Sequence, residues 1–213
     1  MNTDIGSTIY ICAGAVVLMS NQIPQTDRCD GLDALLYSQT VASHKEPDLS
    51  KFEAWTHAGK VAMRVAGAMF LENPQVSLPV PLPESFSLVE LGRKVLRHWV
   101  PDTQLAALSD QPVTALASEL LCRHVSDQGR CIRIMFGVIS LDLIHTMAII
   151  GFESDEVVVG DLLHHRFNPQ KVQGNISVDS YRVQLEREDY DLSRATVIAL
   201  LGARRSEQII ALS

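Results

Sequence analysis

The feature that most constrains the fold is the order of two hydrophobic patterns along the 213-residue chain. Up to about residue 128, apolar residues recur at helical spacing, whereas short β-branched runs separated by turns follow it. Helices grouped before strands are typical of α+β proteins, in which a helical part packs against an antiparallel sheet. The sequence therefore predicts one α+β domain over residues 1–213, with a helical half at 19–128 and a sheet half at 129–213.

The helical half contains several segments whose apolar residues fall on one helical face. Two of them open with the Ser-x-x-Glu spacing of a capping box, at Ser50 and at Ser87. A proline-rich stretch, which favours neither helix nor central strand, separates these two segments. We expect helices at residues 30–40, 50–72, 87–100 and 113–124, with an extended connection at 74–83.

The sheet half contains short runs rich in valine, isoleucine and threonine. Such runs, bounded by polar turns, are typical of strands. The predicted strands are residues 130–139, 145–151, 156–162, 181–185 and 196–201.

The first 19 residues require separate treatment, because residues 7–19 form a nearly unbroken apolar run. This run is too short to span a bilayer, and no Lys or Arg precedes it as a secretory signal would require. It is therefore expected to be a buried strand or helix. Alternatively, the native protein starts at Met19, and residues 1–18 are an extension that does not belong to it.

The overall charge excludes one class of partner. The formal net charge is -7 and the isoelectric point is near 5.4, and no dense cluster of Lys and Arg occurs along the chain. Nucleic-acid-binding proteins normally carry a basic patch that neutralises phosphates. The sequence therefore predicts no nucleic-acid partner.

A histidine and an aspartate stand at matching positions of two successive apolar runs. If residues 144–151 and 156–161 pair as a hairpin with residue 150 facing residue 156, His145 faces Asp161. Facing side chains on neighbouring strands are close enough to hydrogen-bond. A histidine oriented by a carboxylate is half of a nucleophilic triad.

The chain offers four cysteines as the missing nucleophile. Cys29 is favoured, because it follows a polar turn and stands where the first predicted helix begins, and a helix N-terminus stabilises a thiolate. Cys12 stays an alternative, because it would open a helix if residues 13–19 were helical. Cys122 and Cys131 lie inside apolar elements and are expected to be small buried side chains.

Metal ligation is the competing use of these residue types. Cys122 and His124 with Cys131 lack the second tight ligand pair of a structural zinc site. The adjacent His164 and His165 would point to opposite faces of a strand. The sequence therefore predicts neither a metal nor another cofactor.

Three segments resemble a known enzyme family. Residues 27–36 (DRCDGLDALL) are similar to the nucleophile segment of the YopT-type cysteine proteases, which belong to the papain-like superfamily. Residues 145–149 (HTMAI) and 157–161 (VVVGD) are similar to the histidine and aspartate strands of that family, and the spacing is also similar. The resemblance covers a minority of the chain.

This resemblance implies a papain-like fold and a role for each matching residue. Cys29 would be the nucleophile, His145 the general base and acid, and Asp161 the carboxylate that orients the histidine. Papain-like sites also place a Gln or Asn shortly before the cysteine to stabilise the oxyanion. Gln25 is favoured for that role over Gln22.

The implied activity is that of a cysteine protease acting on a protein or peptide. The same triad also serves related thiol hydrolases and acyltransferases, so the resemblance does not fix the reaction. It further implies a bacterial effector exported to a host by a specialised system, and a cytoplasmic enzyme is equally compatible with the sequence. The alternative is a catalytically inactive papain-like scaffold that serves as a protein-binding, adaptor or immunity module.

Overall fold

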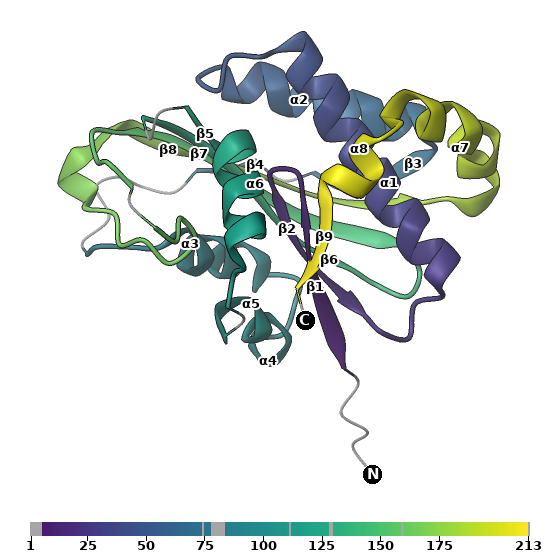
Figure 1. Cartoon of the computed structure of the whole chain (residues 1–213), viewed down its shortest axis with the longest axis horizontal. Helices are drawn as coiled ribbons and strands as arrows, with labels where there is room; N and C mark the ends of the chain where they lie inside the picture. The colour runs from purple at the N-terminus through teal and green to yellow at the C-terminus, as the bar shows by residue number, and fades with distance from the viewer. Residues whose placement is uncertain are drawn as a thin grey trace.

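A nine-stranded mixed sheet runs through the molecule and separates two layers of helices (Figure 1). This computed structural model describes residues 6–73, 75–77, 84–110, 112–127, 130–158 and 160–212. The predicted α+β class is confirmed, because helices predominate in the first part of the chain and the long central strands lie in the second.

The strands of the sheet come from both ends of the chain. They are β1 (Ser7–Cys12), β2 (Ala15–Ser20), β3 (Ala68–Glu72), β4 (Gln75–Ser77), β5 (Ser126–Asp127), β6 (Cys131–Ile139), β7 (Ile144–Ser154), β8 (Val172–Leu185) and β9 (Ile209–Leu212). Their order is β3-β8-β7-β6-β2-β1-β9, with β4 beside β8 and β5 beside β6. The β2–β6 pair is parallel, whereas the other pairs are antiparallel.

The helices form one layer on each face of the sheet. They are α1 (Gln25–Lys45), α2 (Phe52–Val65), α3 (Leu88–Leu96), α4 (Asp102–Leu105), α5 (Ala107–Asp110), α6 (Ala115–Val125), α7 (Arg187–Leu201) and α8 (Arg204–Glu207), with a 3-10 turn at Pro169–Lys171. Helices α1, α2 and α7 pack on one face, and α3 and α6 pack on the other.

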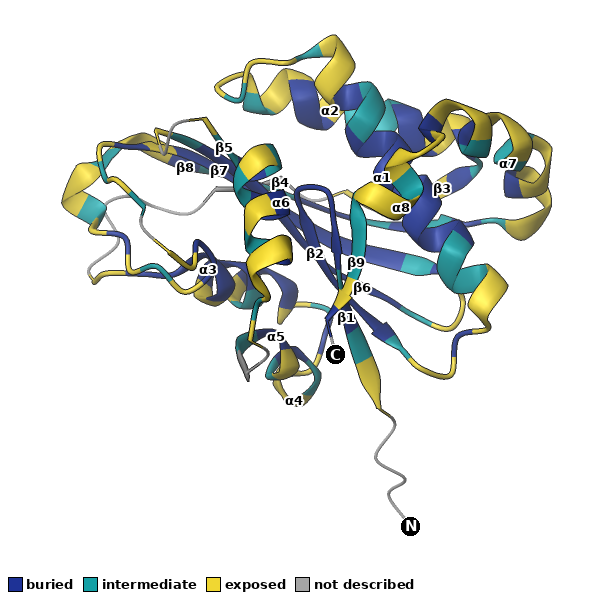
Figure 2. Ribbon diagram, in the orientation of Figure 1, coloured by how far each residue is buried: buried dark blue, intermediate teal, exposed yellow. Residues whose placement is uncertain are grey.

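The two layers explain why the central strands are almost continuously apolar. Neighbouring residues of a strand point to opposite faces, so Met135 of β6 packs under α1 while Phe136 packs under α3. Both faces are covered, and therefore both sets of side chains must be apolar. Figure 2 shows the result, with buried strands at the centre and exposed residues on the outer sides of the helices.

Several predicted elements are confirmed. The helix predicted at 30–40 lies within α1, those at 87–100 and 113–124 correspond to α3 and α6, and the strands at 130–139 and 145–151 correspond to β6 and β7. The capping box at Ser87 and Glu90 is present, with both reciprocal hydrogen bonds. The apolar run at 7–19 forms the β1–β2 hairpin, so the strand alternative is correct.

Other predictions were wrong. Residues 196–201 form the end of α7 and not a strand, and the helix predicted to reach residue 72 ends at Val65, where the chain turns into β3. Ser50 does not cap α2, because its hydroxyl donates to Asp48. Of the connection predicted at 74–83, residues 75–77 form β4, and the others lie outside the described residues.

The helices give no sign of a membrane-spanning segment. Within the described parts of the chain, none of them combines the length and the apolar character that crossing a membrane requires.

Candidate functional site

Cys29 lies in the second turn of α1, which begins at Gln25 and therefore earlier than predicted. Its side chain is half-buried, and Gln25 Nε2 donates to Cys29 Sγ at 3.5 Å. The structure thus brings the predicted nucleophile and the predicted oxyanion residue together. However, the unpaired N–H groups of a helix belong to its first turn, and Cys29 lies beyond it.

His145, the second residue of β7, is completely buried. It pairs with Ile139 of β6 and Val183 of β8 across the sheet. Burial lowers the pKa of the imidazole to about 4, and neither ring nitrogen has a hydrogen-bond partner among the described residues. The ring is therefore neutral at pH 7, and no carboxylate orients it.

His145 and Cys29 lie on opposite sides of α1. A Cβ atom added at Gly31 would lie 3.5 Å from His145 Nε2, so Gly31 faces the sheet. Residues two positions apart in an α-helix point about 200° apart, and Cys29 consequently faces away from the sheet. Asp33, one turn beyond Cys29, receives a 2.9 Å hydrogen bond from Arg205, which shows that this side of α1 faces α8.

Asp161 lies on the opposite face of the sheet from His145. Its Oδ1 accepts a hydrogen bond from the Leu163 N–H at 2.9 Å, and its Oδ2 lies 2.7 Å from His164 Nδ1. The Leu163 side chain packs in the core beneath α3 and α6, whereas His145 points toward α1. The predicted hairpin is wrong, because β7 pairs with β6 and β8 and residues 156–158 and 160–162 form no strand.

The predicted triad is therefore not assembled in the structure. The alternative thiol, Cys12, does not complete the triad either. Cys12 pairs with Ala15 of β2, and Ala15 pairs with Met135 of β6. His145 pairs with Ile139, four residues farther along β6. Burial and the charge of Asp33 raise the pKa of the Cys12 thiol. Cys122 and Cys131, expected to be buried, are half-buried.

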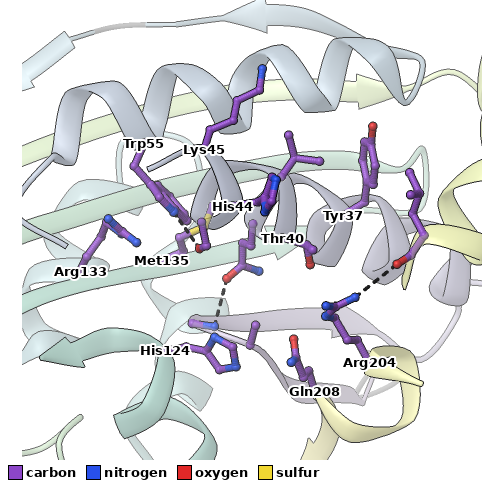
Figure 3. Close-up of a pocket in the computed structure, with 16 residues that line it drawn as sticks. Tyr37, Thr40, His44, Lys45, Trp55, His124, Arg133, Met135, Arg204 and Gln208 are labelled. Atoms are coloured by element: carbon purple, nitrogen blue, oxygen red, sulfur yellow. Dashed lines mark hydrogen bonds between the residues drawn. The ribbon is translucent and has the colours of Figure 1, made fainter. Parts of the chain in front are cut away.

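A cavity of about 480 Å³ lies beside the C-terminal half of α1 (Figure 3). Its other walls come from the β1–β2 turn, α2, α6, β6, and the segment from the end of α7 to Gln208. Figure 3 shows Trp55 and Arg133 at one end and Arg204 at the opposite end, with His124 on the wall between them. Small-molecule sites typically measure roughly 300–1,000 Å³, so the cavity is large enough for a small organic molecule.

The cavity is cationic, although the protein as a whole is acidic. No Asp or Glu lines it within the described ranges, while the chain carries a formal net charge of -7. Its basic lining residues are His44, Lys45, His124, Arg133 and Arg204. Apolar surface is supplied by Ala13, Tyr37, Val41, Trp55, Met135 and Leu200. This combination suits a ligand with an apolar body and a negative charge.

Arg133 is the most unusual of these residues, because it is a buried cation without an ion pair. It is 5% exposed, and no carboxylate of the described residues lies within ion-pair distance of it. Its Nη1 donates to the Asp48 carbonyl oxygen at 3.3 Å, and its guanidinium carbon lies 4.2 Å from the centre of the Trp55 ring. Burial lowers its pKa to about 10, so the group is still charged at pH 7.

The position of this guanidinium is fixed by its surroundings. The indole of Trp55 is held by a 3.0 Å hydrogen bond from Nε1 to Ser43 Oγ of α1. Stacking on an aromatic ring leaves the edge of a guanidinium free to bind an oxyanion. Buried charges are normally paired, because an unpaired one forfeits hydration. Arg133 is thus a buried cation that the carboxylate of Asp48 attracts but does not pair with.

The floor of the cavity is a tight turn held by α1. Gln39 accepts a hydrogen bond from the Gly14 N–H and donates to the Cys12 carbonyl oxygen, both at 3.0 Å. Ala13 has a φ of 50°, in the left-handed region that costs energy for a residue with a Cβ. Its N–H donates to the Gln208 carbonyl oxygen at 2.7 Å. The polar atoms of Gln39 are thus used in shaping the floor.

His124, near the end of α6, adds a neutral polar group. Burial and the nearby charge of Arg123 lower its pKa. Its Nε2 is shielded from solvent and has no hydrogen-bond partner in the part of the chain that the structure describes. At pH 7 the imidazole is therefore a neutral group of the cavity wall.

This site is not among those expected from the sequence. His124 was considered only as a candidate metal ligand, and Gln39 lies within a helical segment without a distinguishing motif. The signal that could have found it is Arg133, a single charge within the otherwise apolar run of β6. A charge at such a position is buried, and a buried charge requires a partner.

Comparisons with known proteins add little to this geometry. No protein-family model and no curated protein matches the sequence. A solved structure described as that of the Evf virulence factor aligns with 96% of this chain and 85% of that chain, at 12% identity and a TM-score of 0.35. A likeness of this degree carries no argument about activity.

Proposed function

We propose that this protein binds a small organic anion in the cavity between α1, α2, α6 and β6. The observation that carries the proposal is Arg133, a buried guanidinium that has no ion-pair partner within the described residues and lines the cavity. An oxyanion on the ligand would supply the missing partner. A charge-assisted hydrogen bond of this kind contributes about 1.5–3 kcal/mol, roughly a 10- to 100-fold gain in affinity.

The rest of the lining supports the same role. Apolar walls favour a ligand with an apolar body, and among the described residues no Asp or Glu lines the cavity. This role differs from both functions expected from the sequence, the protease and the catalytically inactive scaffold that binds proteins. The protease proposal has no supporting geometry, since His145 has neither Cys29 nor Asp161 as a partner among the described residues.

A matched pair of fluorescent dyes tests the proposal. Anilinonaphthalene sulfonate carries an ionised sulfonate, and N-phenyl-naphthylamine has the same aromatic body without it. We expect the sulfonate dye to bind the folded protein more tightly, and Arg133→Met to remove roughly a 10- to 100-fold preference. The neutral dye should bind both proteins alike.

The control is Arg97→Met, which removes an exposed arginine at the end of α3, outside the cavity. It should leave both affinities unchanged. Circular dichroism must show that each variant is folded, because this dye also binds partly unfolded proteins. If Arg133→Met does not fold, Arg133→Gln replaces it. Equal affinity for the two dyes, or an equal loss in Arg97→Met, would refute the proposal.

A further inference from the structure

The cavity has a second arginine at the end opposite Arg133. Arg204, in the first turn of α8, is exposed, and Figure 3 shows it far from the Trp55–Arg133 pair. Its Nη1 donates to the Leu200 carbonyl oxygen at 3.3 Å, a bond to the preceding helical turn. No carboxylate of the described residues forms an ion pair with it.

The wall between the two arginines carries apolar and neutral polar groups. Met135, Tyr37 and Leu200 supply apolar surface, and the polar side chain of Gln39 is occupied by the β1–β2 turn. Figure 3 shows His124, a neutral group, between the two arginines. Lys45 is not equivalent to Arg204, because Figure 3 shows its side chain extending away from the other labelled residues. The cavity therefore has one available guanidinium at each end, with apolar surface and the neutral His124 between them.

We propose that the ligand is a dicarboxylate with an apolar body, one carboxylate binding Arg133 and the other binding Arg204. This inference rests on the proposed function. A carboxylate matches the fork of one guanidinium and balances its single charge. A doubly ionised phosphate would require more positive charge than one arginine provides at each end. Arg133 fixes the deep end of the ligand, and Arg204 selects its length.

Displacement of anilinonaphthalene sulfonate by two series of acids tests this assignment. One series consists of saturated dicarboxylates of increasing length, and the other of monocarboxylates with the same number of carbons. Monocarboxylate affinity should rise steadily with length, because each added methylene buries more apolar surface. Dicarboxylate affinity should peak at one length, where it exceeds the monocarboxylate affinity about 2- to 5-fold, the range expected for an exposed ion pair.

Two variants identify the residue responsible. Arg204→Met should abolish the advantage of the dicarboxylate and leave monocarboxylate binding unchanged. Arg97→Met, the control outside the cavity, should keep the advantage. Loss of the advantage in Arg97→Met, or its persistence in Arg204→Met, would overturn the role given to Arg204.

The outcomes distinguish the dicarboxylate inference from the proposed anion binding on which it rests. A second carboxylate that finds no partner weakens binding, because it loses hydration. If dicarboxylates bind more weakly than monocarboxylates at every length while monocarboxylates still require Arg133, the dicarboxylate inference fails and anion binding stands. If no acid requires Arg133, both fail.

Discussion

At the scale of single residues, the most informative comparison is between Arg133 and His145. Each is a polar residue on the α1 face of a central strand, surrounded in sequence by apolar residues. Arg133 lines a cavity, whereas His145 is sealed beneath Gly31 of α1. Whether a polar strand residue lines a cavity depends on how the covering helix packs on the strand. The alternation of polar and apolar residues along the strand does not predict that packing.

His145 makes folding sensitive to acid. Its pKa is lowered from 6.5 to about 4 in the folded protein, so between these pH values the unfolded chain binds more protons at this residue than the folded protein does. Stability is therefore lost as the pH falls from about 6.5 toward 4. We expect His145 to account for about 2 kcal/mol of lost unfolding free energy at pH 5 relative to pH 7.5.

Urea denaturation of His145→Met at both pH values measures this contribution. The variant has no group to titrate and should lose less stability on acidification than the wild-type protein. His57→Asn, at an exposed position of α2, is the control and should behave like the wild type. Identical losses in all three proteins would contradict the assignment to His145.

At the scale of elements, local signals located the helices better than the strands. The capping box at Ser87 marks the start of α3, because both of its hydrogen bonds form. Residues 196–201 have β-branched side chains but continue the helix that begins at Arg187. Propensity is a weak prior that packing overrides, and here Val197 and Leu201 pack in the core on the α1 side of the sheet.

Two helical glycines should respond oppositely to alanine. A Cβ at Gly31 would meet its neighbours at 3.5 Å or more, which is ordinary contact, whereas a Cβ at Gly92 would lie 2.5 Å from the Phe136 ring. Gly31→Ala should therefore stabilise the protein by about 0.5–1 kcal/mol through helix propensity. Gly92→Ala should destabilise it by about 1–3 kcal/mol through overpacking.

Thermal and urea denaturation of the two variants provide the comparison, and each serves as the control for the other. A loss of stability in Gly31→Ala would show that α1 lies closer to His145 than the structure places it.

At the scale of the whole molecule, the sheet decides which residues can meet. Both His145 and Asp161 were recognised in the sequence, but their pairing depended on a hairpin that does not form. The cavity was not predicted at all, because its walls come from segments as distant in sequence as Gly14, Arg133 and Gln208. Long-range contacts of this kind leave no local signal in a single sequence.

The separation of Cys29 from His145 has a measurable chemical consequence. A thiol paired with an imidazole reacts as the thiolate and slows when the imidazole is removed. Here we expect labelling of Cys29 by a thiol reagent to proceed at the same rate in His145→Met as in the wild type. Site assignment by mass spectrometry distinguishes Cys29 from the other cysteines.

Within the same experiment, Cys12 is the internal control. It is fully buried and should be labelled more slowly than half-buried Cys29. Slower labelling of Cys29 in His145→Met would instead favour the thiol hydrolase that the family resemblance implies.

The pairing of β1 with β9 also sets when the cavity can exist during synthesis. Ile9 pairs with Leu212, and the segment leading into β9 supplies Arg204 and Gln208 to the cavity wall. A nascent chain lacks this wall until residues 204–212 have been synthesised. Contacts this distant in sequence also close slowly. The cavity therefore forms only after β9 has been made and has paired with β1.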